Sequence, residues 1–210
     1  QQMQRQSSSR HPSGWNVIGV SFRSPGVRDR LAQNGFRYHA LELTEDETRS
    51  EEIEILKDVY FLKEQREEVM RALLSPNLKM VTLTISEKGY CYSIETKSVD
   101  WNHPQIKSDL ISLNQALSPP GLILQALKLR QEMGLSSFSC VSCDNLSENG
   151  QILKNVILDL AYHIDSDLAN WINQNTPFPC TMVDRIVPAA TVKEIEKISK
   201  ITGWADPAPV

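Results

Sequence analysis

Two short stretches of the sequence place polar side chains directly beside apolar runs, where they could take part in chemistry. In the first, Asp144 and Asn145 follow the apolar residues 138–141, which have the composition of a buried strand. In the second, Asp184 and Arg185 lie between two apolar pairs. Ligands of open α/β sheets bind outside the carboxyl ends of strands, so these polar groups are candidates for a binding or catalytic site.

In the first stretch, Asn145 has the side chain that suits carbonyl chemistry. Its neutral amide can donate a hydrogen bond to an oxygen on which negative charge develops, as happens when a carbonyl is reduced. Alternatively, Asp144 and Asn145 form an Asx-turn and cap the helix that follows. For Asp184 and Arg185, the alternatives are a buried pair that orients a polyol or sugar acid and a structural ion pair. The residues alone leave these alternatives open and favour the structural ones.

The cysteines Cys140 and Cys143 form a C-x-x-C pair, a spacing found in metal knuckles and redox pairs. A zinc knuckle needs a second pair of ligands, and no suitably spaced pair of Cys or His follows. A redox pair opens a helix, whereas these cysteines lie along an apolar strand. We therefore interpret them as buried strand residues with reduced thiols. His163, on an apolar helix side, is interpreted as a core residue rather than a ligand.

Length and charge exclude several classes of protein. The 210 residues suffice for one large domain or two small ones. The net charge of −4 gives no indication of a nucleic-acid surface. No apolar run approaches the roughly 20 residues of a membrane helix, and residues 1–13 lack the apolar core of a signal peptide. These features predict a cytoplasmic protein that binds neither nucleic acid nor a membrane.

Apolar periodicity and helix- or strand-breaking residues predict strands that alternate with helices. Strands are expected over 15–22, 36–43, 53–59, 80–85 and 138–142. Helices are expected over 27–33, 64–74, 119–134, 152–164 and 167–173 and from 191 onward, with an exposed turn over 44–52. Such alternation implies parallel βαβ units and hence an α/β fold. We expect residues 1–14 to be disordered or frayed, residues 15–203 to form the domain, and residues 204–210 to begin a linker.

The stretch Ser142–Gly150, S-C-D-N-L-S-E-N-G, is similar to the S-C-D-N-x-x-x-N-G signature of the polyol-specific long-chain dehydrogenases, the mannitol dehydrogenase family. In the same order along the chain, Thr82–Tyr90 resembles the family's T-x-T-x-T-E-x-G-Y segment and Thr181–Pro188 its T-M-V-D-R-I-x-P segment. The resemblance runs from about Trp15 to the C-terminus. It implies a Rossmann-type, doubly wound, mostly parallel sheet, here lacking the first strand and the glycine-rich loop with which family members open.

The resemblance also implies NAD-dependent hydride transfer between a keto-sugar acid or ketose and its alcohol, with fructuronate and mannonate ahead of fructose and mannitol. By position, Asn145 matches the asparagine that helps to stabilise the oxyanion. Asp184 matches an acidic residue near the substrate end of the cleft. Thr84 and Glu87 belong to a turn that lines the cofactor cleft, so with Asn145 they are candidates for cofactor binding.

Phe22 and Arg23 are the remaining cofactor-binding candidates, because they lie at the carboxyl end of the first expected strand. An acid that holds the adenosine ribose of NAD is typical there and is absent, and Arg23 could instead pair with the 2′-phosphate of NADP. The family still favours NAD. Its catalytic lysine lies in a C-terminal helical domain that these residues do not include, so the chain alone is expected to be inactive. The alternative is a truncated, non-enzymatic α/β binding or scaffold module.

Overall fold

The computed structural model describes residues 14–43, 48–183 and 191–203. Two compact units divide the chain, Gln1–Val69 with Ile186–Val210 and Met70–Arg185. The frayed start expected before Gly14 and the linker expected over 204–210 lie outside the described residues. The single domain expected over 15–203 stays a prediction.

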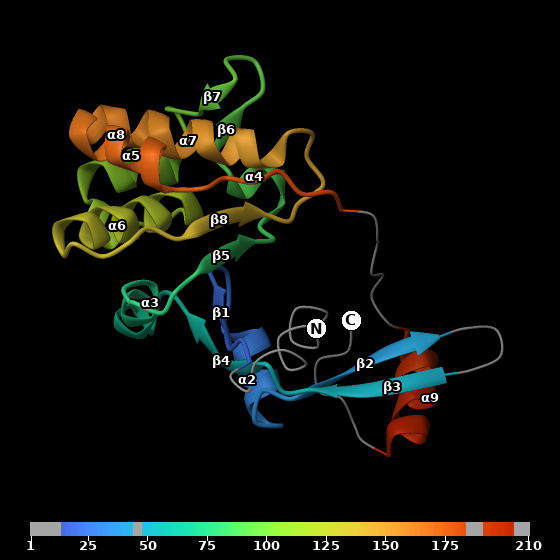
Figure 1. Cartoon of the computed structure of the whole chain (residues 1–210). Helices are drawn as coiled ribbons and strands as arrows, with labels where there is room; N and C mark the ends of the chain where they lie inside the picture. The colour runs from blue at the N-terminus through green and yellow to red at the C-terminus, as the bar shows by residue number, and fades with distance from the viewer. Residues whose placement is uncertain (1–13, 44–47, 184–190, 204–210) are drawn as a thin grey trace. The chain divides into compact units, whose positions relative to one another are not determined.

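The first unit contains a pair of parallel strands (Figure 1). Strand β1 (Val17–Ser21) pairs with β4 (Leu56–Phe61). Helix α2 (Gly26–Ala32) follows β1 and contacts β4, and helix α9 (Val192–Thr202) belongs to the same unit. A parallel pair needs a long connection between its strands, and here that connection includes α2 and a hairpin.

The hairpin is formed by β2 (Tyr38–Leu43) and β3 (Thr48–Ile53), which pair antiparallel from Tyr38 opposite Ile53 to Leu43 opposite Thr48. The expectation of an exposed turn over 44–52 is therefore wrong for residues 48–52, and residues 44–47 lie outside the described part. The acidic composition of β3 concealed the strand. An antiparallel strand with a solvated face tolerates charged side chains, because its backbone hydrogen bonds do not depend on them.

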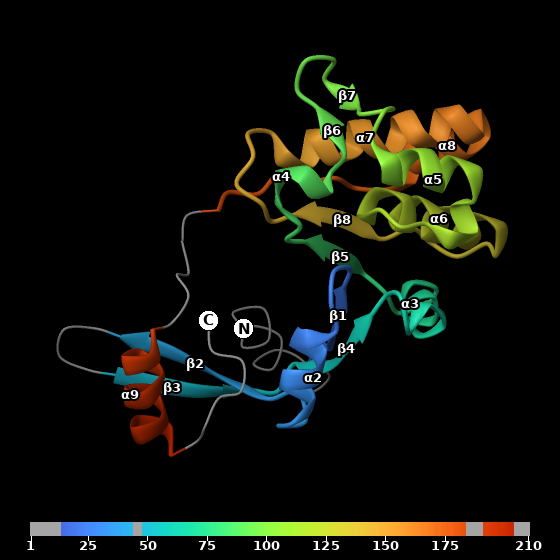
Figure 2. The ribbon, with the colours of Figure 1, turned by 180° about the vertical axis from the view of Figure 1, so that it is seen from behind.

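The second unit contains another parallel pair, β5 (Met80–Leu83) with β8 (Ser139–Ser142). Helix α7 (Asn149–Ile164) contacts β8, while α6 (Pro119–Glu132) and α8 (Ser166–Asn175) contact α7, as Figures 1 and 2 show from opposite sides. The remaining elements are short: α3 (Arg66–Leu73), which contains the boundary between the units, α4 (Ser86–Gly89), β6 (Tyr92–Ser93), β7 (Ser98–Val99), α5 (Pro104–Ile111) and a 3-10 turn over Leu113–Gln115.

Apolar side chains of α6, α7 and α8 form the core of the second unit. Each fully buried Leu or Ile contributes about 1.5–3 kcal/mol relative to an exposed one. Ser118 caps α6, since its hydroxyl accepts a hydrogen bond from the Gly121 N–H at 3.0 Å and donates to the buried carboxylate of Asp109. A Cβ at position 121 would collide with that carboxylate, so the start of α6 requires glycine there. The fully buried side chains include Leu124, Leu127, Leu153, Ile157, Leu160, Leu168 and Ile172.

His163 lies on an exposed side of α7, so the expectation that it belongs to the core is wrong. Its ring packs at 5.1 Å from the ring of Trp101, measured between centroids. The buried stripe of α7 runs through Leu153, Val156 and Leu160 at helical spacing and passes beside position 163. In the described part of the chain, no helix has the length and apolar character that a membrane span requires.

Candidate active site

The Asp144 carboxylate connects the loop after β8 to the turn after β5. Its two oxygens accept hydrogen bonds from the backbone N–H groups of Ile85, at 2.9 Å, and Ser86, at 3.1 Å. The N–H of Cys143 also donates to the carbonyl of Leu83 at 2.8 Å, which extends the β5–β8 pairing by one bond. The candidate residues after both strands therefore lie at the carboxyl end of one parallel pair, as the sequence predicts.

Tyr90 supplies the third donor to the same carboxylate. Its hydroxyl donates to an Asp144 oxygen at 2.7 Å and shares a hydrogen bond of 2.5 Å with the hydroxyl of the buried Ser142. The Tyr90 ring is fully buried, and burial raises the pKa of its hydroxyl. Tyr90 therefore stays protonated at neutral pH and holds Asp144 as a hydrogen-bond donor.

Asn149, at the first turn of α7, connects the same loop to the segment that leads to Asp184. Its side-chain N–H₂ donates to the carbonyl of Asp144 at 3.1 Å and to the carbonyl and hydroxyl of Thr181 at 3.1 and 3.0 Å. The N–H of Thr181 donates back to the Asn149 side-chain oxygen at 3.0 Å. The next residue must be glycine, since a Cβ on Gly150 would lie 2.5 Å from the carbonyl oxygen of Pro179.

Asn145 is exposed at this loop, and its side chain makes no hydrogen bond with any residue that the structure describes. Helix α7 begins four residues later, after Glu148 with a left-handed φ of 53°, and no side chain caps it. The alternative that Asn145 caps this helix is therefore wrong. Asp144 does serve local structure, but at the turn after β5. The Asn145 amide is left available for a ligand.

The turn after β5 carries the other candidates of the second unit. Thr84 and Glu87 are both exposed. Ser86, between them, has a φ of 61°, which is an uncommon and strained conformation for a residue with a side chain. Asp184 and Arg185, from the second polar stretch, both lie outside the residues that the structure describes.

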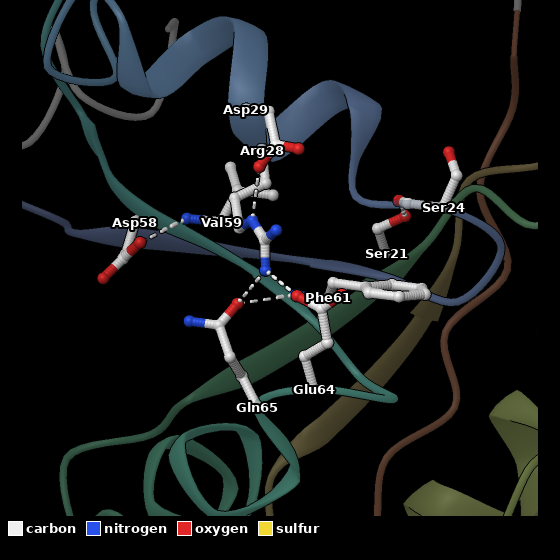
Figure 3. Close-up of polar contacts among 9 residues, drawn as sticks. All are labelled: Ser21, Ser24, Arg28, Asp29, Asp58, Val59, Phe61, Glu64 and Gln65. Atoms are coloured by element: carbon white, nitrogen blue, oxygen red, sulfur yellow. Dashed lines mark hydrogen bonds and ion pairs between the residues drawn. The ribbon is translucent and has the colours of Figure 1, made fainter.

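In the first unit, the loop after β1 carries Phe22, which is half-buried, and Arg23, which is exposed. Figure 3 shows Ser21 and Ser24 on either side of these two residues. The Ser21 hydroxyl donates to the carbonyl of Ser24 at 2.6 Å and closes this loop into a turn. The side chain of Arg23 has no partner among the residues that the structure describes. It is a cation available at the carboxyl end of a parallel strand.

A neighbouring arginine, Arg28, is fully engaged. Its guanidinium contacts carboxylates of Asp29 at 2.8 Å and Glu64 at 2.7 Å, and it donates to the side-chain oxygen of Gln65 at 2.8 Å (Figure 3). The hydrogen bond to Asp29, followed by that to Glu64, raises the pKa of Arg28. The Gln65 oxygen also accepts from the N–H of Phe61, so Arg28 joins α2 to the turn after β4.

The cysteines of the C-x-x-C pair fit the interpretation as strand residues. Cys140 is fully buried within β8, and Cys143 is half-buried just after it. Burial raises the pKa of both thiols, which disfavours the thiolate that metal binding and redox exchange need. Cys91 is also buried and its thiol lies 3.5 Å from the Nδ1 of His103.

The site also contains four residues that the sequence did not indicate as site residues: Tyr90, Ser142, Asn149 and Thr181. Each lies inside a stretch that carries a family motif, so the motifs contained the signal. Their roles are structural, because they hold the exposed candidates in place. Residue type alone could not show this, since the partners lie 32–54 residues apart in sequence.

Comparison with known proteins places this chain among dehydrogenases. A family model described as the mannitol dehydrogenase Rossmann domain matches residues 2–210. D-mannonate oxidoreductase of Escherichia coli (strain K12) is 39% identical over 205 residues, which cover 94% of this chain and 42% of that protein.

Two solved structures are also similar. D-sorbitol dehydrogenase in substrate-free form has a TM-score of 0.87 and 29% identity, over 93% of this chain and 41% of that one. The Pseudomonas fluorescens mannitol 2-dehydrogenase ternary complex with NAD and D-mannitol has a TM-score of 0.83 and 31% identity, over 89% and 39%. The chain thus spans about two fifths of the length of the proteins it matches.

Proposed function

The chain belongs to the mannitol dehydrogenase Rossmann domain family, and we propose that it forms the cofactor-binding part of an oxidoreductase that acts on a keto-sugar acid or ketose. Its α/β fold, with two parallel strand pairs, is that of the related dehydrogenases. The mannitol 2-dehydrogenase in complex with NAD supports NAD as the cofactor, and the names of the relatives support a sugar-derived carbonyl as the reacting group.

Within this class, the proposed reaction is the reduction of fructuronate to mannonate, with fructose and mannitol as the next pair. The higher identity to D-mannonate oxidoreductase than to mannitol 2-dehydrogenase supports this order. The protein that contains this chain would need a further helical domain to supply a general acid. That domain is a proposed partner and would largely decide which sugar acid or polyol is accepted.

In each unit by itself, the residues proposed to contact the cofactor lie just after a parallel strand, at its carboxyl end. In the first unit, the turn after β1 offers Phe22 for packing and Arg23 as an unpaired cation. In the second unit, the turn after β5 offers Thr84 and Glu87. When bound, the nicotinamide supplies the hydride. The part of this chain in the reaction is to hold the cofactor and to stabilise the developing alkoxide oxygen, and Asn145 is the proposed donor to that oxygen.

The observation that carries this proposal is the exposed amide of Asn145 on a loop that is fixed on both sides. Asp144 fixes the loop to the turn after β5, and Asn149 fixes it to Thr181. The side chain of Asn145 takes part in neither of these two sets of hydrogen bonds. A neutral donor held in place without a structural task is what stabilisation of an oxyanion requires, because no reorganisation is needed during the reaction.

The test is the substitution Asn145→Asp in the protein encoded by the complete reading frame. The new carboxylate removes a donor and adds negative charge where negative charge develops, so kcat should fall by at least about 100-fold. The melting temperature should not change, since Asn145 bonds to no described residue. The matched control is Asn170→Asp on the exposed side of α8, where the Tyr162 hydroxyl can still donate to position 170.

Near-normal turnover of Asn145→Asp would refute the proposed role of Asn145. If the complete protein neither binds NADH nor turns over fructuronate or fructose, the non-enzymatic binding or scaffold module becomes the better account.

A further inference from the structure

The side chain of Asn145, the proposed donor, makes no hydrogen bond with any residue that the structure describes. Its position depends on its neighbours. On one side Asp144 makes the contacts, and on the other Leu146 donates its N–H to the carbonyl of Asp144 at 2.9 Å. Both the side chain and the backbone of Asp144 therefore fix the segment that presents Asn145.

The Asp144 carboxylate receives three donors, the N–H groups of Ile85 and Ser86 and the hydroxyl of Tyr90. All three belong to one turn, between the end of β5 and the segment after α4. An ionised carboxylate accepts such bonds about twice as strongly as a neutral group does. An amide in its place could accept on one oxygen only, and its N–H₂ group would face a backbone donor.

Two observations indicate that the groups bonded to the Asp144 carboxylate are held in fixed positions. Ser86 is held at a φ of 61°, a conformation that surrounding contacts must enforce. The Tyr90 hydroxyl lies on a fully buried ring and also bonds Ser142, the last residue of β8. Asp144 is thus hydrogen-bonded to groups that cannot easily shift. These bonds also restrict the backbone of the adjacent Asn145.

We propose that Asp144 is a positioning residue for the reaction: through Ile85, Ser86 and Tyr90, it fixes the direction in which the Asn145 amide points. The inference rests on the proposed function, because it requires that Asn145 acts on the substrate oxygen. Asp144 itself does not touch the substrate. A shift of about 1 Å in a group that orients the reaction can cost 100-fold in rate, so the loss of Asp144 should be visible in kcat.

The experiment is a double-mutant cycle in the complete protein with the variants Asp144→Asn, Asn145→Ala and the two combined, each assayed for kcat, substrate KM and NADH binding. If Asp144 acts through Asn145, Asp144→Asn alone should lower kcat at least about tenfold, and in the Asn145→Ala background it should lower kcat by less than about threefold further. NADH affinity should change little in Asp144→Asn, since Asp144 is not among the residues proposed to contact the cofactor.

A control separates positioning from general loss of stability. Ile157→Val creates a small cavity in the buried face of α7, away from the loop, and should lower the melting temperature without lowering kcat. If Asp144→Asn does not fold, Tyr90→Phe replaces it in the cycle. This variant removes one of the three donors to Asp144 and keeps the ring, so a smaller loss with the same coupling to Asn145→Ala is expected.

The outcomes distinguish the two proposals. Suppose that Asn145→Ala lowers kcat strongly and that the two fold-losses in kcat multiply in the combined variant. This result would overturn the positioning role and leave the proposed function intact. No effect of Asn145→Ala would overturn both, because there would be no group to position. Full activity of Asp144→Asn, with its folded structure retained, would overturn the positioning role directly.

Discussion

The side-chain amide of Asn149 pairs with the backbone of Thr181 as a neighbouring strand would. Its N–H₂ group donates to the Thr181 carbonyl, and its oxygen accepts a hydrogen bond from the Thr181 N–H. The two contacts measure 3.1 and 3.0 Å, and Asn149 is buried. The Thr181 hydroxyl then donates to the carbonyl of Ser142 at 2.6 Å, so the pair extends to the end of β8. Through this pairing, the start of α7 holds the segment that leads to Asp184.

The first prediction is that Asn149→Ala destabilises the protein strongly. It leaves the N–H and the carbonyl of Thr181, both part-buried, without these partners, and a buried unpaired group costs about 1–3 kcal/mol. Urea unfolding measures the loss. Thr181→Ser is the control, because it keeps the hydroxyl and the backbone bonds and should cost little. A loss below about 0.5 kcal/mol for Asn149→Ala would show that water replaces these bonds at no cost.

The second prediction concerns the choice of cofactor. We expect the complete protein to prefer NADH in kcat/KM, as the family implies. Because Arg23 is an unpaired cation after β1, we expect Arg23→Ala to lower any use of NADPH by about tenfold and to leave NADH use unchanged. Arg30→Ala, at another exposed arginine on α2, is the control. A strong preference for NADPH that disappears in Arg23→Ala would mean that the local charge outweighs the family pattern.

The third prediction orders the cysteines by reactivity. Cys180 is exposed and should react with a thiol reagent at pH 8, whereas Cys91 and Cys140 are buried and should react only after unfolding. Burial, with the nearby charges of Asp109 and Asp100, raises the pKa of Cys91 from 9.0 to about 12. Counting modified thiols by mass spectrometry before and after denaturation checks the order. Fast labelling of Cys140 in the native protein would contradict it.

The same pKa shift predicts how stability depends on pH. In the unfolded chain Cys91 loses its proton near pH 9, while in the folded protein it keeps the proton up to about pH 12. The unfolded state thus binds fewer protons between these values. The contribution of Cys91 to the free energy of unfolding is therefore fully present below pH 9 and falls as the pH rises toward 12. Cys91→Ala should flatten this part of a stability curve measured by urea unfolding.

The last prediction is that residues 1–210 alone catalyse no reduction of fructuronate or fructose with NADH. The chain spans about two fifths of the dehydrogenases it matches, and the family's catalytic lysine would lie in the remainder. Calorimetry should also detect only weak NAD binding, because residues 1–210 contain no G-x-G-x-x-G pattern, whose loop holds a pyrophosphate at a helix N-terminus. Measured turnover by the isolated chain would place the general acid within it.

The sequence by itself determined the elements that local patterns specify. The apolar runs of β5 and β8 and the apolar start of α6 after Pro119-Pro120 predict these elements within a few residues of their bounds. The motif Ser142–Gly150 likewise predicted the loop that carries Asp144 and Asn145 after β8. These features rest on neighbours in the chain, whose spacing a sequence shows directly. By contrast, β3 was missed, because its pairing with β2, and not its acidic composition, makes it a strand.

Only the tertiary structure decided what each residue of the motif does. From residue types, a helix cap formed by Asp144 and Asn145 was favoured, and Asn145 was the candidate for carbonyl chemistry. The fold brings Ile85 and Tyr90, 59 and 54 residues away in sequence, onto the carboxylate of Asp144 and leaves the amide of Asn145 exposed. A hydrogen bond depends on the distance and angle between two groups, and those are fixed by the parallel pairing of β5 and β8 and not by the order of residues along the chain.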